Sequence, residues 1–211
     1  MSALIIFDID GTLLETERVT VPAVQRTFAA HSLAVPDHGT ICGFFGTPVE
    51  AYEAWLAKQC PPGMAPQIVA ETNALELHLI GSEGRLYEGA RGVLEELHGR
   101  HVLAVCSNGP DDYVNTFLDA HDVRKYLAAV RARGTRYSGK TEMVAELIAL
   151  NLGSPVIVVG DRHDDIEAAH ANGALAVGAS YGFGGDAETA GADAQITALT
   201  SLTAVIGQLL A

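Results

Sequence analysis

The sequence predicts an α/β protein with a doubly wound parallel sheet and a smaller helical domain inserted after the first strand. Two observations predict the sheet: short unbroken apolar runs that end in polar residues, and amphipathic helical patterns that alternate with them. A third observation predicts the insert, because about seventy residues after the first apolar run contain helical patterns and no strand. With 211 residues, the chain can form one large domain or a domain with a small insert.

The first predicted strand is the apolar run Ala3–Phe7, which breaks into the polar segment Asp8–Thr12. An unbroken apolar run of this length is typical of a strand buried on both faces. Further strands are predicted at His101–Cys106, Pro155–Val159 and Ala174–Val177, with a weaker signal at Leu127–Val130.

Helices are predicted between these strands, at about residues 89–99, 111–121, 139–152 and 164–172. Gly173 is placed to cap the last of them at its C-terminus. The glycine-rich segment Ser180–Asp186 has neither a helix nor a strand signal. Because strand and helix alternate, we expect a Rossmann-like parallel sheet.

The insert contains three helical patterns. One begins near Thr20, one opens with Thr47 as an N-cap and Pro48 at the first helical position, and one runs from about Pro66. We therefore expect an α/β catalytic core of residues 1–15 and 86–211 and a helical cap of residues 16–85.

The composition excludes several classes of protein. A hydrophobic content of 48% excludes wholesale disorder, and a formal net charge of −13 argues against a nucleic acid or a membrane as a partner. The cysteines Cys42, Cys60 and Cys106 are widely spaced and suggest neither a disulfide framework nor a zinc site. The sequence shows no secretory signal or membrane span, so a cytoplasmic protein is expected, either monomer or homodimer.

Acidic residues follow two of the predicted strands. In an open α/β sheet, ligands bind at the carboxyl ends of the strands. That edge is expected to receive Asp8, Asp10, Asp161, Asp164 and Asp165. So many carboxylates repel one another unless a hard divalent cation lies among them, and ligands that are all oxygen select Mg²⁺.

The same edge offers groups that suit a phosphate. Mg²⁺ held by carboxylates usually completes its coordination with water and substrate phosphate. Ser107 and Asn108 follow the second apolar run and supply a hydroxyl and backbone N–H groups for an anion. Lys140, at the start of a predicted helix, is the candidate cation.

Four segments in this order resemble the motifs of the haloacid dehalogenase superfamily: Phe7–Leu13, Ser107–Asn108, Lys140 and Gly160–Asp165. The resemblance runs from residue 4 to about residue 185. The helical insert is similar to the type 1 cap of that superfamily. Within it Gly46–Glu50, and near the end Tyr181–Gly184, look most like the phosphoglycolate phosphatase branch.

The resemblance implies a role for each motif residue. Asp8 would be the nucleophile that forms an aspartyl-phosphate, and Asp10 would be the general acid and then the general base. The phosphoryl oxygens would be held by Ser107, Asn108 and Lys140. Mg²⁺ would be ligated by Asp8, the main-chain carbonyl of Asp10 and Asp161, with Asp165 supporting the ion or Lys140.

Three positions depart from the usual family pattern: Glu15–Thr16 after the first motif, Thr141 after the lysine, and Arg162 in the fourth motif. None removes a catalytic group, but each weakens the argument for assigning to this chain the substrate of a particular relative. Either Asp164 or Asp165 could be the working residue of the fourth motif, with the other serving as an N-cap.

Other interpretations were weighed beside this one. Gly134–Thr141 matches GxxxxGK[ST], the phosphate loop of nucleotidases, but only seventy residues follow it, which favours coincidence. A sugar-phosphate mutase would need its cap to hold a second phosphate, and that cap offers only Arg18, Arg26 and Lys58.

Cleavage of carbon–phosphorus or carbon–halogen bonds is disfavoured by the presence of Asp10, and a catalytically silent phospho-ligand binding protein by the completeness of the motifs. The leading hypothesis is a Mg²⁺-dependent phosphatase whose partner is a small phosphorylated metabolite.

Overall fold

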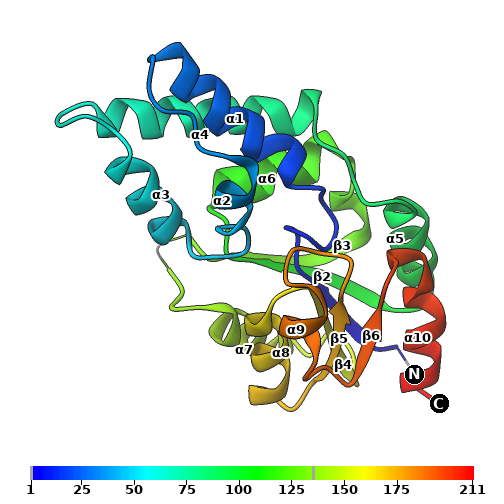
Figure 1. Ribbon diagram of the computed structural model, residues 1–211. Helices are drawn as coiled ribbons and strands as arrows, with labels where there is room; N and C mark the ends of the chain where they lie inside the picture. Colours follow the sequence, from blue (N-terminus) through cyan, green and yellow to red (C-terminus); the bar gives the residue numbers. More distant parts are fainter. Residues whose placement is uncertain (1, 135) are drawn as a thin grey trace.

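The computed structural model describes residues 2–134 and 136–211 and contains a six-stranded sheet in the order β3-β2-β1-β4-β5-β6 (Figure 1). Every neighbouring pair of strands is parallel. The strands are β1 (Leu4–Phe7), β2 (Val102–Ser107), β3 (Leu127–Ala132), β4 (Val156–Gly160), β5 (Leu175–Ala179) and β6 (Ala194–Ile196). The predicted fold class is confirmed, and β6, which has only three residues, was not predicted.

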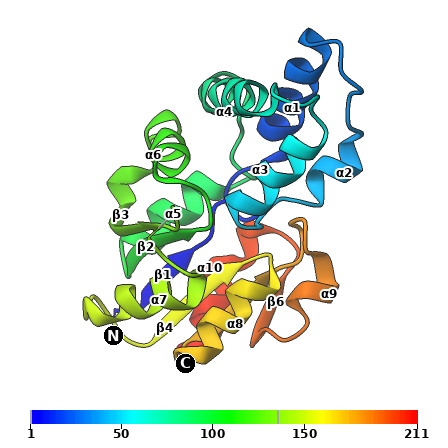
Figure 2. The same ribbon diagram turned by 90° about the vertical axis from the view of Figure 1, so that its left-hand side faces the viewer.

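Helices cover both faces of the sheet, because alternate residues of the strands point to opposite sides. Ile5 and Phe7 of β1 belong to a buried cluster with residues of α5 (Ala90–His98), α6 (Asp111–Ala120) and α10 (Leu202–Leu209). Leu4 and Ile6 belong to a second cluster, with residues of α7 (Lys140–Ala149) and α8 (His163–Ala171). Figure 2 shows α7 and α8 together on one side of the sheet. The sheet is therefore doubly wound.

The end of α8 follows the predicted capping. Gly173 has a φ of 66°, in the left-handed region that glycine adopts without strain. The N–H of Ala174 donates to the Ala169 carbonyl at 2.9 Å, and the N–H of Gly173 to the His170 carbonyl at 3.1 Å. These two bonds form a Schellman motif, so the predicted glycine cap is confirmed.

Four helices form a separate layer over one end of the sheet, in the upper part of Figure 1. They are α1 (Glu17–Ala30), α2 (His38–Cys42), α3 (Val49–Lys58) and α4 (Ala65–Ser82). This layer has its own apolar cluster, which includes Val24, Phe28, Leu56 and Ile68. The three predicted helical patterns correspond to α1, α3 and α4, and the five-residue α2 was not predicted.

Two local predictions were wrong. Thr47 does not cap α3, because Pro48 occupies the N-cap position and the Thr47 hydroxyl donates to the Phe44 carbonyl at 2.6 Å. The segment Ser180–Asp186 is not entirely loop, since α9 (Gly185–Thr189) begins inside it. Met1 of the predicted core and Thr135 of the GxxxxGK[ST] match lie outside the described residues.

The two segments that join the helical layer to the sheet lie side by side. Leu14 and Leu86 form an antiparallel bridge. The N–H of Glu15 donates to the Arg85 carbonyl at 2.9 Å, and the N–H of Tyr87 to the Leu13 carbonyl at 2.9 Å. The helical layer is therefore attached close to the carboxyl end of β1. In the described ranges, no helix is both long and apolar enough to span a bilayer.

Candidate active site

The sheet order brings three of the predicted site residues to one edge. Asp8 comes directly after β1, Ser107 is the last residue of β2, and Asp161 comes directly after β4. Because β1 lies between β2 and β4, these three side chains start from neighbouring strands at their carboxyl ends. This is the edge at which open α/β sheets bind their ligands.

Lys140, the first residue of α7, is buried among carboxylates. Its Nζ lies 2.7 Å from Asp165 Oδ1, 3.1 Å from Asp8 Oδ1 and 3.8 Å from Asp164 Oδ1. Burial disfavours the charged ammonium, but Asp165 and Asp8 outweigh it and raise the pKa of Lys140 well above its ordinary value. Lys140 is therefore a fixed positive charge beside Asp8.

Asp8, Asp161 and Asp165 form the acidic cluster. One oxygen atom from each carboxylate lies within 4.8 Å of the others. Asp8 Oδ2 and Asp161 Oδ1 are buried and have no hydrogen-bond partner among the described residues. Burial, reinforced by neighbouring carboxylates, raises the pKa of both Asp8 and Asp161 to about 7. Two unpartnered carboxylate oxygens in a set that is all oxygen fit a hard cation such as Mg²⁺.

The backbone around Asp161 leaves no room for other side chains. Gly11 has a φ of +74°, and a Cβ there would lie 2.4 Å from Asp161 Oδ2. The same oxygen accepts hydrogen bonds from the N–H groups of Phe183 at 2.7 Å and Gly184 at 3.2 Å. The loop after β1 and the loop after β5 thus hold one oxygen of Asp161 and leave the other facing the cluster.

The side chain of Asp10 lies outside this cluster. Its Oδ1 accepts hydrogen bonds from the hydroxyls of Thr16 at 2.7 Å and Tyr113 at 2.6 Å. Burial raises the pKa of Asp10, although both hydroxyls oppose that shift. The metal ligand expected from this residue is its main-chain carbonyl, so the position of its side chain does not conflict with the prediction.

Thr16 and Tyr113 are functional candidates that the sequence did not single out. Thr16 was noted only as a departure from the family pattern. Tyr113 is 103 residues from Asp10 in the sequence, and it is the packing of α6 against the sheet that brings them together. A hydroxyl six residues after Asp10 was the one signal available for Thr16.

The two aspartates of the fourth motif make different contacts. Asp165 is buried; its Oδ2 accepts the Arg162 N–H at 3.2 Å and its Oδ1 meets Lys140. Asp164 has a side chain that is 39% exposed and accepts a hydrogen bond from Asn108. The geometry therefore assigns Asp165, rather than Asp164, to the acidic cluster.

Ser107 and Asn108 lie beside this cluster in different ways. Ser107 is fully buried, and its Oγ accepts the Gly109 N–H at 3.0 Å. The Asn108 amide donates to the Gly46 carbonyl at 2.9 Å and to Asp164 Oδ2 at 2.7 Å. Asn108 thus links the sheet edge to the helical layer through its side chain.

This fold, with a lysine and acidic residues at the carboxyl edge of a parallel sheet, defines the class of the protein as a Rossmann-like α/β enzyme. The chain belongs to the haloacid dehalogenase-like hydrolase family, which it matches over residues 5–179. It is a phosphomonoester hydrolase of that family, as its phosphatase relatives indicate.

Two curated relatives are similar over most of their length. One is a 5'-nucleotidase of Pseudomonas aeruginosa, 27% identical over 199 residues that cover 87% of this chain and 85% of that protein. The other is a phosphoglycolate phosphatase of Vibrio cholerae, 27% identical over 194 residues that cover 85% of each chain. A solved hydrolase of the haloacid dehalogenase-like family from Streptococcus pneumoniae shares the fold, with a TM-score of 0.83, 20% identity and coverage of 97% and 98%.

Proposed function

We propose that this chain is a Mg²⁺-dependent phosphatase of small phosphorylated metabolites that works through an aspartyl-phosphate on Asp8. The observation that carries the proposal is the buried group of Lys140, Asp8, Asp161 and Asp165, which brings together one fixed cation, three carboxylates and two unpartnered carboxylate oxygens. Such a site suits a dianionic phosphoryl group and a divalent cation together.

In this proposal, Asp8 supplies the attacking oxygen. A bond forms between a carboxylate oxygen of Asp8 and phosphorus while the bond from phosphorus to the leaving oxygen breaks. Asp10 donates its proton to that leaving oxygen. Asp10 then accepts a proton from a water molecule, whose oxygen attacks phosphorus and releases inorganic phosphate and free Asp8.

Asp8, Asp161 and the main-chain carbonyl of Asp10 would hold the Mg²⁺ ion. When bound, the ion supplies positive charge that offsets the phosphoryl oxygens and the clustered carboxylates. Lys140 and the Ser107 hydroxyl would hold phosphoryl oxygens. Asp165 holds Lys140 in place, since their 2.7 Å contact fixes the ammonium beside Asp8.

Asp10 is supported as the proton carrier by its surroundings. A general acid works best when its pKa is brought toward the pH of the reaction, and burial raises the pKa of Asp10. The hydroxyls of Thr16 and Tyr113 hold its Oδ1, which leaves Oδ2 for the leaving group. Residues 16–85 would act as a cap over residues 1–15 and 86–211, and would exclude water from the closed site.

The experiment that tests the proposal is a rapid-quench reaction with para-nitrophenyl phosphate and Mg²⁺, followed by peptide mass analysis. We expect a transient mass increase of one phosphoryl group on the peptide that contains Asp8. Turnover with no such species on Asp8, under conditions in which nitrophenol is released in a burst, would contradict the covalent mechanism.

A further inference from the structure

A cavity lies next to the Asp10 carboxylate, between the sheet edge and the helical layer. It has an accessible volume of about 100 Å³ and is open to solvent, which leaves room for a small leaving group. Residues from both parts of the molecule line it, including Asp10, Thr20, Phe44, Tyr52, Glu76 and Asp112. Because Asp10 is the proposed proton donor to the leaving oxygen, the rest of the leaving group must occupy this cavity.

The lining of the cavity is acidic. Three of its lining residues are acidic, namely Asp10, Glu76 and Asp112, and none of the lining residues described is a lysine, arginine or histidine. Two arginines outside the described lining are each paired with a glutamate. Arg133 is 2.6 Å from Glu50, and Arg162 is 2.9 Å from Glu188.

Glu76 of α4 is the acidic residue that the helical layer contributes to the cavity. It accepts a hydrogen bond from the hydroxyl of Thr20, and burial, with Asp10 and Asp112 adding to it, raises the pKa of Glu76 to about 7. Its second carboxylate oxygen is free of protein hydrogen bonds in the described ranges. That oxygen can accept a hydrogen bond from a ligand.

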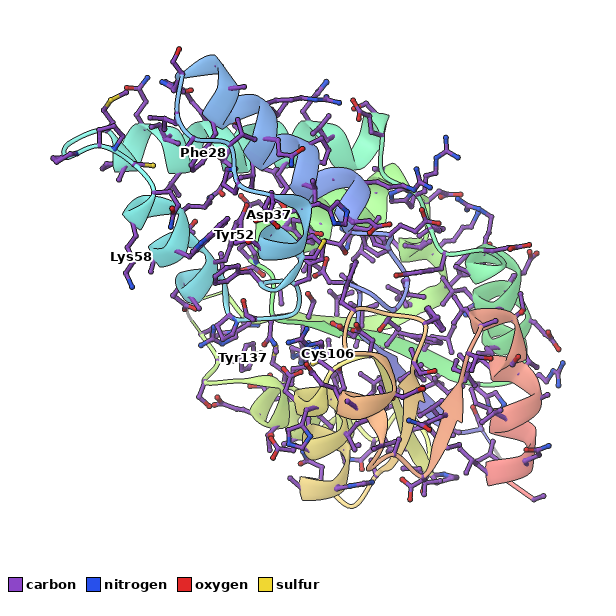
Figure 3. The ribbon with its side chains drawn as sticks, in the orientation of Figure 1. Phe28, Asp37, Tyr52, Lys58, Cys106 and Tyr137 are labelled. Carbon is purple, nitrogen blue, oxygen red and sulfur yellow. The ribbon has the colours of Figure 1, made fainter. Side chains whose placement is uncertain are left out.

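Tyr52 provides a second polar contact. Its side chain is buried to about nine-tenths, and its hydroxyl has no hydrogen-bond partner among the described residues. Figure 3 shows Tyr52 within the helical layer, above the sheet in which Cys106 lies. Burial, with Glu76 and Glu53 adding to it, raises the pKa of Tyr52 well above its ordinary value. A buried hydroxyl without a partner costs free energy, so a ligand that bonds to it is favoured.

Part of the cavity wall is apolar. Phe44, Phe45, Val49 and Leu77 line it, and Phe44 stacks on Trp55 with ring centroids 4.6 Å apart. This part of the wall suits a carbon skeleton, and the polar lining residues suit the substituents on that skeleton.

We infer that this cavity selects an uncharged leaving group that carries hydroxyls, and rejects one that carries a second anion, with Glu76 and Tyr52 as the residues that determine this specificity. The inference rests on the proposed function and narrows it. A second carboxylate or phosphate would lie beside the carboxyl groups of Glu76 and Asp112, and none of the described lining residues is a cation that could offset it. A hydroxyl would instead donate to Glu76 and accept from Tyr52.

Three two-carbon substrates of nearly equal size test the inference: 2-hydroxyethyl phosphate, 2-phosphoglycolate and 2-aminoethyl phosphate. They place a hydroxyl, a carboxylate or an ammonium at the same end of the leaving group. We expect kcat/KM for the hydroxyl compound to exceed that for the carboxylate compound by at least about tenfold. Equal values, or a preference for the carboxylate, overturn the inference. If kcat/KM for the ammonium compound exceeds that for the hydroxyl compound more than tenfold, the inference that the leaving group is uncharged is overturned.

The variant Glu76→Gln tests the assigned residue. It keeps the size of the side chain and removes its negative charge, so the hydroxyl-to-carboxylate ratio of kcat/KM should fall at least about fivefold. Glu71→Gln, the same change on the exposed side of the same helix, should leave the ratio unchanged. An unchanged ratio in folded Glu76→Gln overturns the role of Glu76. Tyr52→Phe should also lower the ratio, because it removes the hydroxyl that a neutral ligand would meet.

Failure of this inference is distinct from failure of the proposed function. An enzyme that hydrolyses para-nitrophenyl phosphate with Mg²⁺ but prefers 2-phosphoglycolate remains a phosphatase with a different specificity. A folded protein that hydrolyses none of these phosphates contradicts the proposed function itself. The wild-type comparison needs no variant, so the inference can be tested even if Glu76→Gln does not fold.

Discussion

The phenol of Tyr113 donates a hydrogen bond to Asp10 Oδ1 across 2.6 Å, from α6 to the loop after β1. Thr16 donates to the same oxygen at 2.7 Å. Two donors on one oxygen fix the plane of the carboxylate and leave its other oxygen toward the cavity. Tyr113 is therefore a positioning residue, which acts through Asp10 rather than on the substrate.

Tyr113→Phe should lower kcat about tenfold and leave KM nearly unchanged, because it removes one bond to a charged group and keeps the bond from Thr16. Steady-state kinetics with para-nitrophenyl phosphate measure this. Phe117→Leu on the same helix, which trims the core without touching Asp10, serves as the control for loosened packing. If the control lowers kcat as much as Tyr113→Phe does, the hydroxyl has no special role.

Asp8→Asn should reduce activity by several orders of magnitude, since an amide cannot act as the nucleophile. The variant should stay folded because the two side chains have nearly the same shape. Asp119→Asn, an exposed position on α6, is the matched control and should retain full activity. Circular dichroism verifies folding, and substantial turnover by a folded Asp8→Asn would refute the role of Asp8.

Activity should depend on Mg²⁺ and should be poorly supported by Ca²⁺. Ca²⁺ forms longer bonds and takes more ligands than Mg²⁺, so it disturbs the alignment of the attacking and leaving oxygens. The measurement is the rate after chelation and after return of each ion at equal concentration. Full activity after exhaustive chelation would mean that the acidic cluster has another purpose.

Glu76 should make the protein less stable as the pH rises. Its pKa is about 7 in the folded protein and near 4.5 when the chain is unfolded, so between these values the folded state binds more protons. The wild type should therefore lose stability from pH 4.5 to pH 7, fully retaining this contribution only below pH 4.5.

Glu76→Gln removes that dependence, so it should be more stable than the wild type at pH 8, by about 1–2 kcal/mol, and not at pH 4.5. Urea unfolding at the two pH values measures the difference. In Glu71→Gln the sign should be reversed and the effect small, because His31 lowers the pKa of that exposed carboxylate. A Glu76→Gln variant with the same relative stability at both pH values would show that Glu76 titrates normally.

Small organic phosphates should be hydrolysed with far higher kcat/KM than phosphoproteins. The helical layer lies over the sheet edge and leaves a cavity of about 100 Å³ beside Asp10, which admits a small metabolite and not a folded protein. Parallel assays on 2-hydroxyethyl phosphate and a phosphorylated protein compare the two. Preference for the phosphoprotein would show that the helical layer does not restrict access.

The parallel sheet could be predicted because apolar runs buried on both faces have few alternative structures. The same reasoning predicted that Asp8, Ser107 and Asp161 lie at one edge of the sheet, since each directly follows or ends such a run. Lys140 could be named as the candidate cation from its place at the start of a predicted helix, and the family resemblance then supported that choice. The position of Gly173 in the sequence correctly predicted where α8 ends.

Contacts between distant elements could not be predicted. Tyr113 contacts Asp10 only because α6 packs beside β1. No local sequence pattern indicates that these two residues lie close together. Likewise, no local signal indicated that the Asn108 amide donates a hydrogen bond to Gly46 in the helical layer, and its role in phosphate binding stays a prediction. Thr47 looked like a helix cap, but the proline after it took the N-cap position instead. β6 was missed because three residues are too few for a periodic signal.

The position of β1 also constrains the order in which the molecule can be made. Leu4 pairs with Val102 on one side and with Val156 on the other, so both neighbours of the first strand are synthesised long after it. Residues of α1, α3 and α4 find their apolar partners within a much shorter stretch of chain. During translation, the helical layer can therefore collapse first. The strand that precedes the nucleophile can pair on both sides only after more than half of the polypeptide has left the ribosome.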